Sequence, residues 1–129
     1  MTDPLVSIDV SEIHEGRLGE LEKAMRELVE FVDAKETQPV LYSVYFNPDN
    51  TRMTVLQVHP DSASMEFHMD VAGSTFRGLS ELLTLLRIDI YGMASERLLD
   101  QMRAKARMLG NAALVVHEPH VGFARFGGR

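Results

Sequence analysis

The feature that most constrains the fold is an uninterrupted succession of strand, turn, strand and helix over residues 40–69. The first residues of this stretch are rich in β-branched and aromatic side chains, which strands favour. Residues 47–50 (Asn-Pro-Asp-Asn) are typical of a turn, because Pro fixes φ and Asn and Asp bond to nearby backbone. Residues 53–59 extend again, and a helix begins after Asp61 or the proline before it, either of which is the expected cap. The hairpin therefore fixes which residues of two strands share a face.

The remainder of the chain divides into segments with strand or helix periodicity. Residues 5–11 alternate apolar and polar side chains, which indicates a strand, and residues 17–35 repeat apolar side chains every three or four positions, which indicates an amphipathic helix. Gly73-Ser74 is expected to break the helix that follows the hairpin. Beyond it we predict a short helix ending near Leu86, a strand over 87–93, a helix from Ser95 to Leu109, a short strand over 113–116 and an irregular tail.

Up to Met93 this order is strand, helix, strand, strand, helix, strand. It is the split βαβ pattern of the ferredoxin-like fold, so the predicted fold class is α+β. At 129 residues the chain is expected to form one domain. Residues 1–94 would make the ferredoxin-like unit, and residues 95–129 would extend the same domain with a C-terminal helix, a short strand and a tail.

Composition excludes several classes of function. The net charge of −6 argues against a nucleic-acid surface, which needs clustered Lys and Arg. The chain has no cysteine, which excludes disulfides, thiolate nucleophiles and Cys-ligated metals. It has no apolar run long enough to span a membrane and no basic region before an apolar run at its start. We therefore expect a cytoplasmic protein that binds neither nucleic acid nor membrane.

The strands predict that both faces of the sheet are covered. Val6, Ile8 and Val10 share one face of the first strand, while residues 40–46 carry bulky side chains on both faces. One layer of helices covers only one face, so a second copy of the chain most simply covers the other, giving a homodimer. The alternative is that the C-terminal helix and tail fold over the open face.

Polar side chains of one parity can gather on a single sheet face. The predicted set is Ser7, Asp9, Ser11, Ser43, Tyr45, Asn47, Gln57, His59, Asp89 and Tyr91. Polar groups that converge in an apolar layer are typical of small-molecule sites. The prediction depends on an inferred register, because a slip of one residue exchanges the faces. The alternative is that these groups satisfy one another or lie at solvated strand ends.

The chain resembles the antibiotic biosynthesis monooxygenase (ABM) superfamily in its strand order, its hairpin, and the run Val55-Leu56-Gln57-Val58-His59-Pro60-Asp61-Ser62 leading to His68 and Phe76. The resemblance covers about residues 5–93. It implies a dimeric α/β barrel of ferredoxin-like subunits with ligands held between sheet and helices. The superfamily includes cofactor-free quinol and polyketide monooxygenases and haem-degrading enzymes.

The resemblance also implies roles for single positions. Asp9 stands where family members commonly place a polar residue, often Asn, and His59 stands where they usually have Trp. His68 matches a histidine that many members carry in the following helix. The haem-degrading branch has its iron-ligating histidine near residues 79–80, where this chain has Leu-Ser, which counts against haem degradation.

The leading hypothesis is a cofactor-independent monooxygenase that acts on a quinol-like or polyketide aromatic molecule. His59 would be the general base, because imidazole titrates near neutral pH, and Asp9 would orient it or hold the substrate hydroxyl. Tyr45 and Tyr91 would donate hydrogen bonds to the developing oxyanion. Asn47, Gln57 and His68 complete the expected substrate-binding set. No cofactor or metal is expected.

Other interpretations of these residues stay open. His59 fits equally a strand-end histidine half in solvent, and His68 fits a residue at the boundary of the core. The His117-Glu118-Pro119-His120 segment contains two imidazoles, but Pro119 prevents a regular helix from presenting both to a metal. A non-catalytic ligand-binding or partner-binding protein of the same fold is the main alternative function. Haem binding through His59 or His68 is a third.

Overall fold

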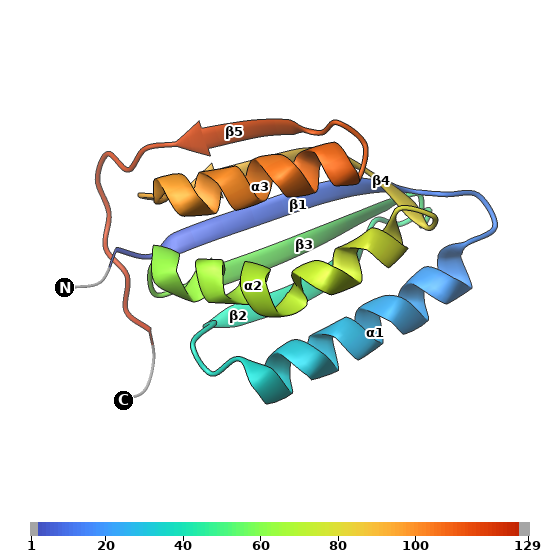
Figure 1. Ribbon diagram of the computed structural model, residues 1–129, viewed down its shortest axis with the longest axis horizontal. Helices are drawn as coiled ribbons and strands as arrows, with labels where there is room; N and C mark the ends of the chain where they lie inside the picture. Colours follow the sequence, from blue (N-terminus) through green and yellow to red (C-terminus); the bar gives the residue numbers. More distant parts are fainter. Residues whose placement is uncertain (1–2, 127–129) are drawn as a thin grey trace.

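The computed structural model describes residues 3–126. Its elements are, in order, β1 (Leu5–Ile13), α1 (Leu18–Lys35), β2 (Leu41–Phe46), β3 (Arg52–His59), α2 (Ser62–Leu79), β4 (Leu83–Tyr91), α3 (Glu96–Met108) and β5 (Ala113–His117). The five strands form one sheet in the order β2-β3-β1-β4-β5, and the three helices lie side by side over one of its faces (Figure 1). The α+β class and the ferredoxin-like order are confirmed.

The segment after α2 differs from the prediction. α2 runs without a break through Gly73 and Ser74, and β4 begins at Leu83 rather than at Arg87. Met69, Ala72, Phe76 and Leu79 are buried along one side of α2, so core packing outweighs the poor helix propensity of the glycine. The leucines at 82–86 also fit helical spacing, but Leu83 and Leu85 pair with β1 and point inward as in a strand.

The other helices form as predicted. Leu21, Met25, Leu28 and Val32 of α1 are buried in the core. The Asp61 carboxylate accepts a hydrogen bond from the Ser64 N–H at 2.9 Å and so caps α2. α3 connects β4 to β5, which is parallel to β4 and adds a strand at the sheet edge.

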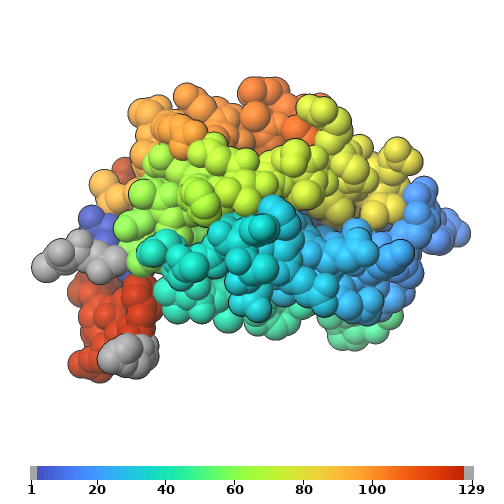
Figure 2. Space-filling view, turned by 60° about the horizontal axis from the view of Figure 1, so that its bottom comes forward, coloured from blue at the N-terminus to red at the C-terminus, as the bar shows by residue number. Residues whose placement is uncertain are grey.

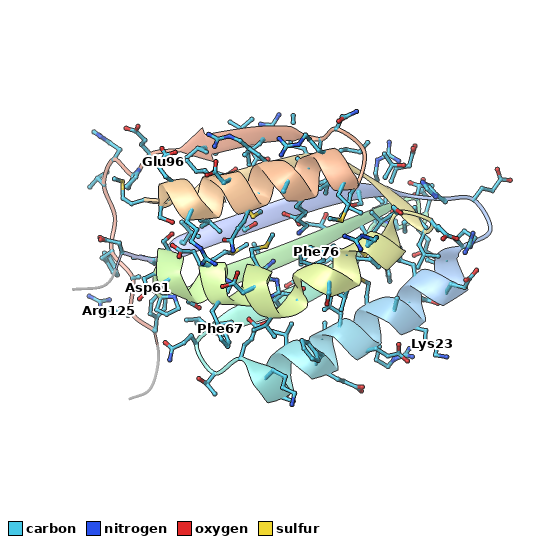
Figure 3. The ribbon with its side chains drawn as sticks, in the orientation of Figure 1. Lys23, Asp61, Phe67, Phe76, Glu96 and Arg125 are labelled. Carbon is cyan, nitrogen blue, oxygen red and sulfur yellow. The ribbon has the colours of Figure 1, made fainter. Side chains whose placement is uncertain are left out.

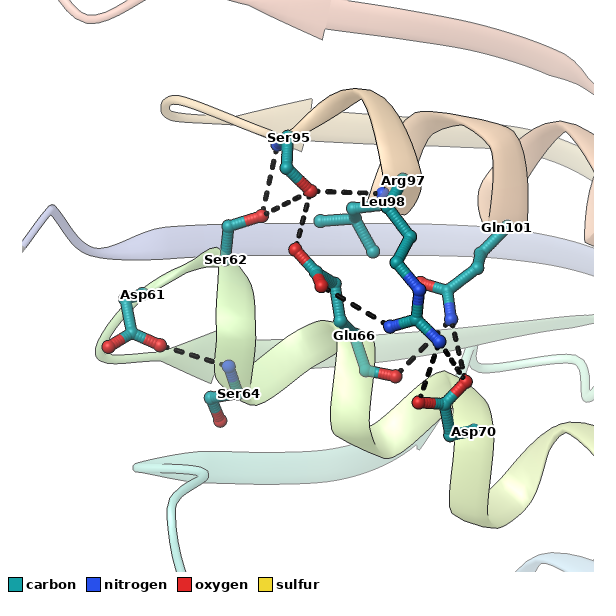
Figure 4. Close-up of polar contacts among 9 residues, drawn as sticks. All are labelled: Asp61, Ser62, Ser64, Glu66, Asp70, Ser95, Arg97, Leu98 and Gln101. Carbon is teal, nitrogen blue, oxygen red and sulfur yellow. Dashed lines mark hydrogen bonds and ion pairs between the residues drawn. The ribbon is translucent and has the colours of Figure 1, made fainter.

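A polar network on the outer surface joins α3 to α2 (Figure 4). Arg97 of α3 donates to both carboxylate oxygens of Asp70 at 2.8 and 2.9 Å. The Ser95 hydroxyl donates to Glu66 at 2.5 Å and also accepts from the Leu98 N–H, which caps α3. These contacts hold α3 in a fixed position over the sheet, which matters for the buried lysine described below.

The second face of the sheet carries no helix among the described residues. Val6, Ile8 and Val10 of β1 lie on it, opposite Val58, Leu56 and Thr54 of β3. α3 packs beside α2 on the helical face, so the alternative in which the C-terminal helix folds over the open face is wrong. The tail after β5 leaves the end of the sheet and projects away from the body (Figure 2), with Val121 and Phe123 exposed.

Within residues 3–126, every helix is too short or too polar to cross a membrane.

Candidate active site between the sheet and the helices

The register of β1 with β3 brings part of the predicted set together. Ser7 lies opposite Gln57, and Leu5 lies opposite His59. Asp9, Gln57 and His59 are therefore all buried on the helical face of the sheet. The prediction that these residues share a face is confirmed.

The other strands do not follow the predicted register. Tyr42, not Ser43, lies opposite Gln57, so Ser43 and Tyr45 point to the open face. Ile88 lies opposite Asp9, which turns Asp89 and Tyr91 to the open face as well. The predicted register was thus wrong by one residue in both β2 and β4. A slip of one residue exchanges the faces of a strand, so the single polar face does not form.

Asn47 is a turn residue and lies outside this layer. Its side-chain oxygen accepts hydrogen bonds from the backbone N–H groups of Thr51 at 2.9 Å and Arg52 at 2.8 Å. This closes the β2–β3 hairpin, and the side chain is occupied by the turn.

A buried carboxylate–imidazole pair lies at the centre of the helical layer. His68 of α2 approaches Glu36, the residue that ends α1, with 2.8 Å between Nδ1 and Oε2, and neither side chain has exposed surface. When Glu36 is a carboxylate, which only accepts hydrogen bonds, a neutral His68 ring carries its proton on Nδ1 and its lone pair on Nε2. Nε2 is buried and has no hydrogen-bond partner among the described residues. The interpretation of His68 as a boundary residue is therefore wrong.

His59 is buried too, but both of its nitrogens are engaged. Nδ1 lies 2.6 Å from the Ser64 hydroxyl and Nε2 lies 2.9 Å from the Gln57 side-chain oxygen. Burial, reinforced by nearby His68, lowers the pKa of His59 to about 4. The ring is therefore neutral at pH 7 and is not a strand-end histidine in solvent.

Asp9 forms an ion pair with a residue that the sequence analysis missed. Lys105 of α3 donates from Nζ to Asp9 Oδ2 at 2.5 Å, and both side chains are more than nine-tenths buried. The ammonium also lies 4.6 Å from the centre of the ring of Phe76, a buried residue of α2 (Figure 3). A signal existed in the sequence: Lys105 falls three residues after Met102, within the apolar stripe of α3.

Tyr42 and Phe76 connect the two buried pairs. The Tyr42 ring meets the His68 ring edge-on at 5.2 Å, and the Phe76 ring lies 6.2 Å from His68. Burial, with the carboxylates of Asp9 and Glu36 nearby, raises the pKa of Tyr42 well above its usual value. Its hydroxyl therefore keeps its proton and can donate a hydrogen bond.

The space inside this layer is small in the structure. A cavity of about 20 Å³, enough for roughly one water molecule, is lined by Asp9, Tyr42, Phe76, Lys105 and apolar neighbours. Outside it lies an apolar groove of about 400 Å³ between α1 and α2. Leu28 and Leu79 border both spaces. Movement of these two side chains would therefore join the cavity to the surface.

A second polar cluster occupies the open face of the sheet. Arg87 donates two hydrogen bonds to Asp89 at 2.7 and 3.0 Å, and His117 Nε2 lies 2.8 Å from the same carboxylate. The Tyr91 and His117 rings are stacked with centres 4.3 Å apart. The Arg87 hydrogen bond is the main cause of the lowered pKa of Asp89. No group of three or more potential metal ligands occurs in the part of the chain that the structure describes.

Comparisons with solved structures agree with this architecture. MupZ from Pseudomonas fluorescens is 19% identical with a TM-score of 0.74, covering 97% of this chain and 91% of its own. SnoaB from Streptomyces nogalater, described as a cofactor-independent oxygenase, is 16% identical with a TM-score of 0.61, covering 72% and 95%. A Caulobacter crescentus protein assigned to the antibiotic biosynthesis monooxygenases is 13% identical with a TM-score of 0.61, covering 73% and 91%.

The sequence itself gives no further match. No family model matches the chain. No curated protein matches it significantly. The fold of the chain is nevertheless that of ABM-like proteins, as the resemblance implied.

Proposed function

We propose that this protein is a cofactor-independent monooxygenase of a quinol-like or polyketide aromatic molecule, with His68 as its general base and Glu36 as the residue that orients it. The observation that carries the proposal is the buried, unpartnered Nε2 of His68. A buried polar atom without a partner is costly, and a substrate hydroxyl or acidic C–H group would supply the missing contact.

The geometry favours His68 over His59 as the base. His59 gives its lone pair and its N–H to Ser64 and Gln57, and its lowered pKa makes it a weak base. His68 presents a free nitrogen, and Glu36 would stabilise the imidazolium that forms when His68 takes a proton. His59 then serves to hold Ser64 and the start of α2 against β3.

The reaction needs only the substrate, oxygen and a proton carrier. His68 removes a proton from an activated CH₂ group, and the resulting carbanion transfers an electron to O₂. The radical pair joins to form a C–O bond, and the imidazolium returns its proton to the terminal peroxide oxygen. Loss of water from the hydroperoxide leaves a carbonyl, so one oxygen atom enters the product and the other becomes water. The buried layer excludes solvent from the anion.

The fold comparisons support this class of reaction, because SnoaB is described as a cofactor-independent oxygenase. One observation favours the alternative of a ligand-binding protein without chemistry. The cavity of about 20 Å³ is far smaller than an aromatic ligand, so binding requires Leu28 and Leu79 to move first. Ligand binding without oxygen consumption would support that alternative.

Oxygen uptake with a panel of hydroquinones and anthrone-like phenols tests the proposal. Wild type, His68→Gln and His59→Gln would be compared after correction for spontaneous autoxidation. We expect protein-dependent uptake that falls by about 10² or more in His68→Gln and much less in His59→Gln. Equal loss in both folded variants, or full activity in His68→Gln, would contradict the assignment.

We further propose that the chain forms a homodimer through the open sheet face. That face carries the apolar side chains Val6, Ile8, Val10, Leu56 and Val58 at its centre, and no helix of the described chain covers them. A contiguous apolar face of this kind is typical of an interaction surface. A second copy would present the same strands and give a self-complementary, two-fold contact.

A further inference from the structure

We propose that the Asp9–Lys105 pair is a subsite for an oxyanion, so that the ligand of this pocket is an aromatic molecule that carries an ionisable hydroxyl or an enolisable carbonyl. The inference rests on the proposed function, since Phe76 lies beside both Lys105 and His68 in the same buried layer between the sheet and the helices. It adds the chemical group that the ligand must carry and the residue that recognises it.

Lys105 has more hydrogen-bond donors than the described part of the chain uses. An ammonium group has three N–H donors, and within residues 3–126 the only hydrogen bond of this one goes to Asp9 Oδ2. Its other near contact is the face of the Phe76 ring at 4.6 Å. Donors of this ammonium therefore remain without an acceptor among the described residues, and Lys105 lines the cavity together with Asp9.

The burial of the Asp9–Lys105 pair costs free energy. Burying two charges away from water costs more free energy than burying a well-packed apolar pair of similar volume. Among the described residues, Asp9 has only the Ser7 hydroxyl, at 3.3 Å, in addition to Lys105, so the pair is not embedded in a large stabilising network. A ligand oxygen that accepts a hydrogen bond from Lys105 would be attracted more strongly there than in water, because of the same low dielectric that makes the pair costly to bury.

Phe76 lies beside both Lys105 and His68. Phe76 contacts both groups, with its ring 6.2 Å from the His68 ring and 4.6 Å from Lys105 Nζ. An aromatic ligand lying against Phe76 would thus reach a proton acceptor on one side and a cation on the other. When His68 takes a proton, the negative charge develops on an oxygen that Lys105 can stabilise.

Binding of two dyes tests the inference without turnover. The probes are 2-hydroxyanthraquinone, whose colour changes when its hydroxyl ionises, and anthraquinone, which has no hydroxyl. We expect the hydroxyl of the protein-bound dye to ionise at a lower pH than that of the free dye. In Lys105→Met, the affinity for the ionised dye should fall about tenfold or more, while that for anthraquinone stays within about twofold.

Two further variants keep the test interpretable. Lys105→Met leaves the Asp9 carboxylate buried without its cation, so the neutral double variant Asp9→Asn/Lys105→Met is measured beside it, with circular dichroism to verify folding. Arg103→Met removes an exposed cation from the same helix and should bind both dyes like wild type. The same preference for the ionised dye in the double variant as in wild type would overturn the inference.

The wild-type titration is decisive on its own. If wild type binds neither dye, or if the bound dye ionises at the same pH as the free dye, the inference is overturned. If the protein consumes oxygen but the ionisation of the bound dye does not depend on Lys105, the oxygenase proposal stands and the subsite is removed. Lys105-dependent ionisation without oxygen uptake would support the subsite and remove the oxygenase.

Discussion

His68 Nδ1 and Glu36 Oε2 lie 2.8 Å apart, with both side chains fully enclosed between α1, α2 and the sheet. The residues are far apart in sequence and meet because Glu36 ends α1 where α2 passes over β3. The contact fixes the ring orientation and the tautomer of His68 together.

Replacing Glu36 with Gln should reduce turnover, because a neutral amide no longer stabilises the imidazolium of His68. We expect oxygen uptake to fall by about 10², with a smaller effect on binding of the unionised substrate. The exposed α1 residue Asp33 provides the control Asp33→Asn. Uptake by Glu36→Gln within about twofold of wild type would remove Glu36 from the proposed mechanism.

Stability should fall in mild acid because of His59. Its folded pKa is about 4, below the unfolded value of 6.5, so between these pH values the unfolded chain binds a proton that the folded chain does not. The free energy of unfolding should therefore decrease as pH falls through this window, by at most about 1.4 kcal/mol per pH unit from this group. Urea unfolding at a series of pH values should show a shallower decrease for His59→Gln, whereas His120→Gln, at an exposed position, should follow wild type.

The two glycines within α2 should be replaceable with a gain in stability. A Cβ at Gly73 or Gly78 would meet no atom within 4 Å, so alanine costs no contact there and improves helix propensity. We expect each substitution to raise the free energy of unfolding by about 0.5–1 kcal/mol. Gly92→Ala is the contrasting variant, because φ there is +130° and a Cβ would lie 2.7 Å from the Pro4 carbonyl oxygen. Stabilisation by Gly92→Ala, or destabilisation by the two α2 substitutions, would contradict this account.

A charge at the centre of the open face should separate the proposed dimer. Leu56 lies on that face between Ile8 and Ser43, so Leu56→Glu would place a carboxylate in the contact between two copies. Light scattering after gel filtration should change from twice the chain mass of 14.5 kDa to the mass of one chain. Lys23→Glu, on the outer side of α1 (Figure 3), should keep the mass of wild type. A monomeric wild type would contradict the dimer.

The local sequence pattern was sufficient to predict most of the fold. Periodicity located α1, the hairpin and α3, and the Asp61 and Ser95 caps lie where the sequence indicated them. The boundary between α2 and β4 was predicted wrongly because residues 79–86 fit both the helical and the strand period. Only the pairing of Leu83 with Ile13 decides between the two.

The site was less predictable because it depends on contacts distant in sequence. Asp9 and His59 were identified by strand parity, and their common face is real. Ser43 and Tyr45 were placed on the wrong face, since the turn sets a register that composition alone does not determine. Glu36 belonged to no motif, and Lys105 was marked only by its place in the apolar stripe of α3. Their partners are visible only when α1, α2, α3 and β1 are packed together.

The pairing of Asp9 with Lys105 also has a consequence for synthesis on the ribosome. β1 occupies the middle of the sheet, yet the cation for its buried carboxylate arrives 96 residues later on α3. A nascent chain that has produced β1 to β4 therefore contains all the strands of the ferredoxin-like unit and an uncompensated charge inside it. Native packing of the central strand has to wait until α3 has emerged, so the helix after residue 94 governs when folding of this unit can be completed.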